Sequence, residues 1–299
     1  MKKKSLSAKN KVSEKGSEDT KYGYVWKMLF GIFLSWVGFY FGNSFRNTVF
    51  APSNIEIQSK CQNVTCSSDY KNYPIFDGCT PKTNCRRCVK DGLVSQEEIV
   101  SLMRLLQNGM KHGGSSGGAS ILDLHTGALS KGQQFINIYK SLESTELSET
   151  FPNSDMQVYR KVKNKILAAI ANEFGLDPKK LHLTNPTFFS RMTTTPAKTQ
   201  HDEYWHYHID KIQYGSFDYT SLLYLADYGS DFKGGQFVFD KTTNNNEEVV
   251  IEPRNGRVSF FTSGSENPHH VQKVVEGVRY AVTISFTCDP SKAITDPLV

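Results

Sequence analysis

The second half of the chain consists of short segments rich in valine, isoleucine, threonine, phenylalanine and tyrosine, separated by glycine, asparagine, aspartate and proline. Segments of this kind are typical of β-strands joined by turns, and their number constrains the fold more than any other feature. The expected strands are Leu181–Thr184, Thr187–Met192, Thr220–Ala226, Gln236–Phe239, Val249–Ile251, Arg257–Phe261, His270–Val275 and Arg279–Thr287. So many short strands in one block indicate a β-sandwich or a barrel.

Two amphipathic helices are predicted before these strands. The first starts with a capping box, Ser95 and Glu98, and ends at the flexible loop Gly113–Gly118. The second starts near Ser154 and ends before Gly175. The apolar face of the first helix carries Ile99, Leu102, Met103, Leu106 and Met110. That of the second helix carries Val158, Val162, Ile166, Ile170 and Phe174. Helices followed by strands indicate an α+β domain. The glycine-rich loop lacks the Gly-Lys-Ser/Thr ending and the preceding strand of a nucleotide-binding loop.

An uncharged run of 18 residues, 28–45, lies between Lys27 and Arg46. Its length falls within the ~17–25 residues that span a bilayer as a helix, and its aromatic residues suit the interfaces. The lysines before it predict a type II protein, with a cytoplasmic tail, a signal-anchor and a body in the lumen of the secretory pathway (endoplasmic reticulum or Golgi) or outside the cell. A cleaved signal peptide and a buried core helix are the alternatives. The long polar lead-in and the lack of a small-x-small site disfavour the signal peptide.

The basic character of the chain belongs to its first 27 residues. They carry a net charge of +5, which equals the net charge of the whole chain, so residues 28–299 are neutral by count. This distribution gives no support for a nucleic-acid-binding body.

Five of the six cysteines crowd residues 61–88, and Cys288 is the sixth. In an oxidising compartment they predict structural disulfides, although the sequence alone does not choose among the possible pairings. Cys85-Arg86-Arg87-Cys88 can also be a redox or zinc motif, but a second CxxC and a nearby histidine are lacking. The sequon Asn63-Val64-Thr65 lies in the same segment and is consistent with a luminal glycoprotein.

The segment His208-Ile209-Asp210 places a histidine and a carboxylate two residues apart in a run that looks extended. On a strand, such residues point to the same face and can hold one metal ion. Two histidines and one carboxylate with open coordination positions are the pattern of non-haem Fe(II) oxygenases, so a distant histidine is required. Candidates are the adjacent His269 and His270, and alternation lets only one of them face inward.

Arg279 follows His269 by ten residues. If the strand that carries the histidine turns at Glu276-Gly277 into an antiparallel partner, Arg279 points into the same cavity. A buried arginine there offers a bidentate fork for the carboxylate of a co-substrate.

Taken together, these features resemble the Fe(II)/2-oxoglutarate dioxygenases of the prolyl 4-hydroxylase group. The resemblance covers about residues 180–290 and rests on His208-x-Asp210, Tyr224, Gly234-Gly235-x-Phe237, Pro253-x-x-Gly256-x-x-x-Phe260, His269 and Arg279. It implies a double-stranded β-helix, that is, a jelly-roll core. It also implies that His208, Asp210 and His269 ligate Fe(II), and that Arg279 anchors 2-oxoglutarate with help from Tyr224 and Thr283. His206 and His270 are extra histidines beside ligand positions and are not expected to be ligands.

The activity that the resemblance implies is hydroxylation of a luminal protein side chain, of the prolyl or lysyl type. The co-substrates would be O2 and 2-oxoglutarate, the products succinate and CO2, and L-ascorbate would keep the iron reduced. The corresponding division of the chain is 1–27 cytoplasmic tail, 28–45 transmembrane signal-anchor, 46–92 cysteine-rich luminal stem, 93–180 helical support region, 181–290 dioxygenase domain and 291–299 tail.

Other readings of the same residues are a zinc hydrolase, a cupin-type site and a catalytically silent binding module. His206-x-His208 can be a zinc pair, but that leaves Tyr224 and Arg279 without a role. A cupin-type site requires a glutamate soon after the histidine pair, where this chain has Lys211, Ile212 and Gln213. A silent luminal module would keep the fold and bind glycan or protein, and the intact set of site residues argues against it.

Overall fold

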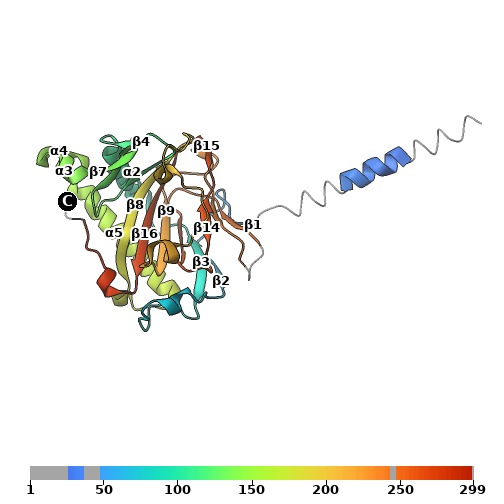
Figure 1. Cartoon of the computed structure of the whole chain (residues 1–299), viewed down its shortest axis with the longest axis horizontal. Coiled ribbons are helices and arrows are strands. Elements are labelled where there is room, and N and C mark those ends of the chain that lie inside the picture. Colours follow the sequence, from blue (N-terminus) through green and yellow to red (C-terminus); the bar gives the residue numbers. More distant parts are fainter. Residues whose placement is uncertain (1–25, 37–47, 243–246, 298–299) are drawn as a thin grey trace, which may run out of the picture. The chain divides into compact units, whose positions relative to one another are not determined.

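The protein is described here by a computed structural model that covers residues 26–36, 48–242 and 247–297 (Figure 1). The chain divides into two units, Met1–Asn47 and Thr48–Val299. In the first unit, residues 26–36 are helical. Most of the predicted tail and the second half of the predicted span lie outside the described residues. Within the described residues, no helix has both the length and the apolar character needed to cross a membrane.

The second unit contains a large sheet and a small sheet that face each other. The large sheet has the strand order β2 (Lys60–Val64), β3 (Cys85–Lys90), β13 (Val258–Thr262), β9 (Tyr219–Tyr224), β16 (Arg279–Thr287), β8 (His182–Met192), β5 (Ala119–Leu122), β6 (Ala128–Gly132) and β4 (Gly114–Ser115), with β7 (Gln134–Asn137) paired to β6. The small sheet has the order β1 (Thr48–Ala51), β12 (Val249–Ile251), β11 (Phe237–Phe239) and β14 (His269–Val271). A separate pair joins β10 (Phe232–Gly234) to β15 (Val274–Gly277).

Both faces of the large sheet are buried at its centre, as β9 illustrates, because all six of its residues are buried. Leu222 and Tyr224 belong to the core between the two sheets, together with Phe237 and Ile251 of the small sheet. Leu223 points the other way, into a core shared with the helices. Successive side chains of a strand point to opposite faces, so one strand contributes to two cores.

Two long helices cover the outer face of the large sheet, and α5 runs beside β8 and β16 in Figure 1. They are α2 (Gln96–Met110) and α5 (Asn153–Phe174), and the short helices are α3 (Ile138–Ser141), α4 (Ser144–Thr150) and α6 (Asp210–Tyr214). The predicted capping box of α2 is confirmed, and so is the end of α5 at Gly175, which adopts a left-handed conformation at φ 68°. The predicted loop after α2 contains the two-residue strand β4.

The predicted strands are present, with two changes. Leu181–Thr184 and Thr187–Met192 form one continuous strand, β8, which contains the cis peptide bond Asn185–Pro186. His270–Val275 is divided between β14 and β15. The part of the predicted polar hairpin from 243 to 246 lies outside the described residues.

Residues 48–92 do not form a separate stem. Strand β1 pairs with β12, and β3 pairs with β13, so this segment supplies strands to both sheets. The physical reason is that β12 and β13 would otherwise present unpaired backbone groups at a sheet edge. The region 93–180 also contributes strands to the large sheet, in addition to its helices. The last residues pack on the same unit, since Lys163 forms an ion pair with Asp296.

The six cysteines form three disulfides, and the described residues include no free cysteine. The pairs are Cys61–Cys88, Cys66–Cys85 and Cys79–Cys288. Cys85 and Cys88 therefore bond to two different partners, which disfavours the redox or zinc reading of the CxxC motif. The third disulfide joins the cysteine-rich segment to the residue after β16 across 209 residues of sequence.

Candidate metal and co-substrate site

The structure brings His208, Asp210 and His269 together, with one possible ligand atom of each lying within 4.8 Å of the others. The Nε2 atom of His208 lies 3.6 Å from Oδ1 of Asp210, and Nε2 of His269 lies 3.7 Å from its Oδ2. Asp210 and His269 are buried, whereas the side chain of His208 is 30 % exposed. The cluster thus lies at the bottom of an opening, with His208 on its solvent side.

The backbone holds the two histidines in register, because His208 and His269 form an isolated antiparallel bridge with two N–H···O=C bonds of 3.0 Å. The prediction that Asp210 continues an extended strand is wrong, since Asp210 is the first residue of α6. Ile209 between them is extended, at φ −126° and ψ 116°. One extended residue is enough to turn the two flanking side chains toward the same side.

The orientation of both imidazole rings is fixed by backbone carbonyl groups. Nδ1 of His208 lies 3.0 Å from the carbonyl oxygen of His206, and Nδ1 of His269 lies 2.9 Å from that of Asn267. A carbonyl oxygen only accepts, so each Nδ1 carries the proton and each Nε2 presents its lone pair to the centre. Burial lowers the pKa of His269 to about 4, which keeps this ring neutral and able to ligate a cation at neutral pH.

Thr220 is a site residue that the sequence analysis missed. Its hydroxyl donates to Oδ2 of Asp210 at 2.6 Å and lies 2.9 Å from the hydroxyl of Ser263. This bond holds the carboxylate between the two histidines. The available signal was strand alternation, because Thr220 lies two and four residues before Leu222 and Tyr224 on β9 and so shares their face.

Aromatic side chains surround His269. The ring of Phe237 lies 5.0 Å from the imidazole, centre to centre, and those of Phe261 and Phe239 lie at 5.0 and 6.3 Å. These contacts restrict the rotation of the ring and exclude water from its buried side.

The two extra histidines face other partners, as expected. His206 is 64 % exposed and its Nε2 lies 2.5 Å from a carboxylate oxygen of Glu203. Nδ1 of His270 lies 2.9 Å from Asp240, because alternation on β14 turns this residue away from the cluster.

The cluster opens into a cavity of about 470 Å³, and Arg279 lies in its wall. Arg279 is fully buried. Its Nε donates to the carbonyl oxygen of Gly235 at 2.9 Å and its Nη1 lies 3.5 Å from the sulfur of Met192. Its Nη2 has no hydrogen-bond partner among the described residues. Thr283 and Tyr204 also line the cavity.

Tyr224 lies next to Arg279 but is not among the residues that line the cavity. The carbon Cζ of Arg279 lies 5.5 Å from the centre of its ring, and its hydroxyl lies 2.9 Å from the hydroxyl of Ser259. The ring therefore contacts the guanidinium from the side of the sheet.

Two glycines allow Arg279 to reach this position. A Cβ on Gly235 would lie 3.1 Å from Cδ of Arg279, and a Cβ on Gly277 would lie 2.0 Å from the carbonyl oxygen of Asp231. Gly277 also adopts φ +73°, which favours glycine. The predicted antiparallel pair around Glu276-Gly277 is absent, since β15 pairs with β10 and β16 pairs with β8 and β9. The chain instead crosses between sheets at Gly277, and this crossing carries Arg279 into the cavity.

The residues present fit both groups that the sequence implies. Two neutral imidazole nitrogens and one carboxylate, with an open side toward a cavity, suit a divalent iron ion. An unused guanidinium nitrogen in the same cavity suits a carboxylate.

Comparison with known proteins agrees with this geometry. The family model of the 2OG-Fe(II) oxygenase superfamily matches residues 191–287. The mouse protein named "2-oxoglutarate and iron-dependent oxygenase domain-containing protein 3" is 52% identical over 236 residues, which are 79% of this chain and 73% of that protein. The human protein of the same name is 51% identical over 234 residues, 78% and 72% of the two chains.

The chain belongs to the family of 2-oxoglutarate and iron-dependent oxygenase domain-containing protein 3. More distantly, this family member is 26% identical over 228 residues to mouse prolyl 3-hydroxylase 1, covering 71% of this chain and 29% of that protein. Among solved structures it is similar to a prolyl hydroxylase from Trichoplax adhaerens, in complex with a hypoxia inducible factor peptide fragment, at a TM-score of 0.45 and 16% identity. That likeness covers 67% of this chain and 83% of the other.

Proposed function

We propose that this chain is a dioxygenase that uses Fe(II), 2-oxoglutarate and O2, on a double-stranded β-helix core. The observation that carries the proposal is that the His208, Asp210 and His269 cluster lines the same cavity as Arg279, whose Nη2 has no hydrogen-bond partner among the described residues. Zinc hydrolysis gives no role to a buried arginine in that cavity. An iron centre held by two histidines and one carboxylate, with a 2-oxoacid bound next to the iron, gives a role both to the cluster and to Arg279.

In this proposal His208, Asp210 and His269 hold the iron, and Thr220 fixes the carboxylate of Asp210. Arg279 binds the distal carboxylate of 2-oxoglutarate, with Thr283 in the same wall and Tyr224 supporting the guanidinium. When bound, the iron and 2-oxoglutarate supply the oxidation chemistry that consumes O2, releases succinate and CO2 and hydroxylates the substrate. L-Ascorbate is the expected reductant.

The substrate that we propose is a protein side chain of the prolyl or lysyl type. The prolyl 3-hydroxylase relatives support this choice. The cavity mouth supports it as well, because it is lined by the exposed residues Glu203, His206, Tyr207 and Gln213. Aromatic and polar side chains at a mouth suit an extended peptide.

The location that we propose is the lumen of the secretory pathway or the cell exterior, on a type II signal-anchor at 28–45. The three disulfides support an oxidising compartment. The exposed Asn63 of the sequon, on β2, is accessible for glycosylation.

The experiment is to measure succinate formed by the purified chain with Fe(II), 2-oxoglutarate and ascorbate, and the iron bound per chain. We expect His208→Ala and Asp210→Ala to abolish both the formation of succinate and the binding of iron. His206→Ala is the matched control and should change neither quantity. His269→Ala should behave like the first two variants and His270→Ala like the control. The opposite result for this pair would overturn the assignment of the distal ligand.

Absence of both iron and succinate in the wild type would contradict the enzyme proposal. Iron bound with no succinate formed would favour the silent binding module. A hydroxylated protein is identified by a mass increase of one oxygen on a co-expressed luminal protein, present with the wild type and absent with Asp210→Ala.

A further inference from the structure

A second arginine, Arg87 on β3, is buried with its charged group unused. Its side chain is 1% exposed, and none of its three guanidinium nitrogens has a hydrogen-bond partner among the described residues. The ring of Phe239 lies 4.8 Å from its Cζ. A buried cation without an acceptor is costly, so its retention points to an acceptor that the chain itself does not provide.

Arg87 lies in the wall of a polar cavity of about 500 Å³. Gln62 is its direct neighbour across the β2–β3 pair, so both side chains point to the same face. The Oε1 atom of Gln62 and the hydroxyl of Ser67, also in this wall, are buried and have no hydrogen-bond partner in the part of the chain that the structure describes. The rim includes the exposed residues Asn63, Thr65 and Ser68, which places the mouth at the surface.

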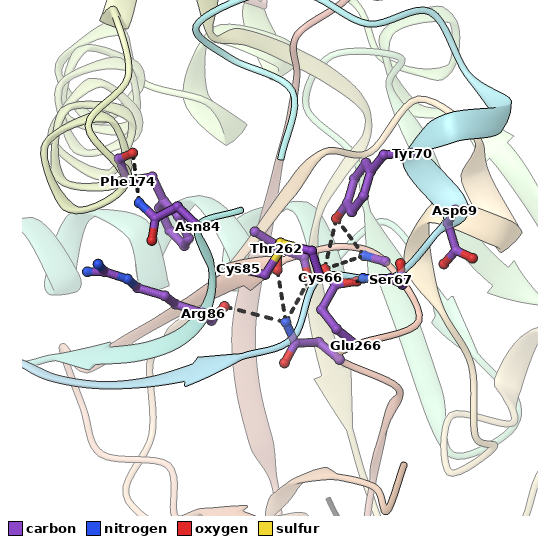
Figure 2. The surroundings of a disulfide bond; sticks show 12 residues. Cys66, Ser67, Asp69, Tyr70, Asn84, Cys85, Arg86, Phe174, Thr262 and Glu266 are labelled. Atoms are coloured by element: carbon purple, nitrogen blue, oxygen red, sulfur yellow. Dashed lines mark hydrogen bonds between the residues drawn. A yellow bond between two sulfur atoms is a disulfide. The ribbon is translucent and has the colours of Figure 1, made fainter. Parts of the chain in front are cut away.

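The two acidic residues of this cavity are committed elsewhere. Figure 2 shows Tyr70 and Ser67 turned toward Glu266, whose carboxylate accepts from the Tyr70 hydroxyl at 2.9 Å and from the Ser67 amide at 3.2 Å. Asp69 accepts from the amide of Ser265 at 2.6 Å. Neither carboxylate forms an ion pair with Arg87, although both residues line the same cavity.

This cavity is distinct from the proposed iron site. Phe239 and Phe261 lie between Arg87 and His269, since Phe239 contacts both residues and Phe261 pairs with Arg87 on the neighbouring strand. A ligand of Arg87 therefore has its own entrance and its own partners.

We propose that this cavity binds a carboxylate group, held by the guanidinium of Arg87 and the hydroxyl of Ser67. The planar fork of an arginine matches the two oxygens of a carboxylate. Asp69 and Glu266 in the wall oppose any anion, and they oppose a doubly charged one such as phosphate more strongly than a carboxylate, because the repulsion grows with the charge. The carboxylate belongs either to a small free acid or to an aspartate or glutamate side chain of a bound peptide.

The experiment is equilibrium dialysis of the full chain against labelled acetate, at constant ionic strength held with a bulky sulfonate salt. Arg279 is a second carboxylate-binding group, so the binding is measured in the wild type and in Arg279→Met. In Arg279→Met we expect one saturable acetate site, and the addition of Arg87→Gln to that variant should weaken it at least tenfold. Arg86→Gln is the matched control, because Arg86 is the adjacent residue and pairs with Glu173, and it should bind as the wild type does.

A capped peptide with one aspartate, used as competitor, distinguishes the two sources. If the peptide displaces labelled acetate at a concentration at least tenfold lower than unlabelled acetate does, the ligand is an acidic side chain. If the peptide displaces it less effectively than that, the ligand is a free acid. Either result supports a carboxylate site. Equal or tighter binding of phosphate, or acetate binding unchanged by the addition of Arg87→Gln to Arg279→Met, would overturn it.

Thermal unfolding provides the second measurement. In acetate-free buffer, Arg87→Gln should unfold at the same or a higher temperature than the wild type, because it removes an unpartnered buried charge. Acetate should raise the unfolding temperature of Arg279→Met, and it should not raise that of the double variant Arg279→Met with Arg87→Gln. A lower unfolding temperature of Arg87→Gln, with no response of Arg279→Met to acetate, would show that Arg87 is structural and contradict the proposal.

Discussion

Arg257 and Arg279 are both completely buried, yet their guanidinium groups have opposite surroundings. Arg257 bonds both carboxylate oxygens of Asp91 and the carbonyl oxygens of Ala51, Pro52, Glu252 and Ile55. Arg279 lines a cavity, and its guanidinium has one carbonyl partner, one sulfur partner and one nitrogen without a partner among the described residues. A buried cation with all its donors bonded holds parts of the chain together, whereas one with an unused donor is available to a ligand. Arg87 also belongs to the second class, because its guanidinium nitrogens have no hydrogen-bond partner among the described residues.

Replacing Arg257 tests the first class and should have the largest effect. Arg257→Met leaves the carboxylate of Asp91 buried and unpaired, which typically costs about 3–5 kcal/mol. The measurement is the free energy of unfolding in urea. The double variant Arg257→Met with Asp91→Leu should recover most of the loss, because it removes the unpaired charge as well. A single variant as stable as the wild type would remove the distinction between the two arginines.

Replacing Arg279 tests the second class. Arg279→Met should raise the KM for 2-oxoglutarate about 10- to 100-fold, since a hydrogen bond to a charged group contributes about 1.5–3 kcal/mol. It should leave the free energy of unfolding unchanged or slightly increased, because the lost charge was incompletely bonded. Steady-state kinetics and urea unfolding of the same preparation check both expectations. A large loss of stability with an unchanged KM would place Arg279 in the structural class.

Tyr224 separates direct from indirect contact with 2-oxoglutarate. Tyr224→Phe keeps the ring beside Arg279 and removes only the hydroxyl that bonds Ser259. One neutral hydrogen bond contributes about 0.5–1.5 kcal/mol, so the KM for 2-oxoglutarate should rise no more than about tenfold. Ser259→Ala is the control, because it removes the same bond from the other side. A rise as large as that in Arg279→Met would make the hydroxyl a principal ligand of the co-substrate.

Glu98 is a buried carboxylate that forms ion pairs with Lys161 and Lys165, and its contribution to stability should depend on pH. Although burial raises it, the Lys165 ammonium, the Ser95 amide and the Lys161 ammonium together lower the pKa of Glu98 to about 2. An unfolded glutamate titrates near 4.3, so the contribution to stability is complete above that value and is lost as the pH falls toward 2. Glu98→Gln should therefore reduce the free energy of unfolding at pH 7 by about 1–2 kcal/mol, and by less at pH 3. Chemical unfolding at both pH values checks this, and an equal loss at both would contradict the ion-pair explanation.

Local patterns in the sequence were sufficient to predict most of the elements. The capping box at Ser95 and the glycine after α5 depend only on neighbouring residues, and both are confirmed. The early strands β1, β2 and β3 were missed, because their polar residues and cysteines do not alternate clearly. The partner of β1 is β12 and that of β3 is β13, both more than 150 residues away, and no local signal carries such a pairing. Strand β2 pairs with β3.

The predicted ligand positions were found because His208-x-Asp210 and the spacing from His269 to Arg279 are visible in the sequence. The supporting groups were not, because each acts across sequence separation. Thr220 reaches Asp210 from β9, and the carbonyl of Gly235 reaches Arg279 from the turn before β11. Side chains that bond a functional residue from another strand leave no spacing rule to detect.

By itself, the sequence determined the residue types that bind a cation and a carboxylate and the α+β class that carries them, because these follow from chemistry and local periodicity. The tertiary structure alone decided which buried charges are satisfied. Arg87, Arg257 and Arg279 are the same residue type in strand-rich segments, yet only the packing of distant strands supplies partners to Arg257 and withholds them from Arg87. The physical reason is that hydrogen bonding of a buried charge depends on the few ångströms around it, and those neighbours come from every part of the chain.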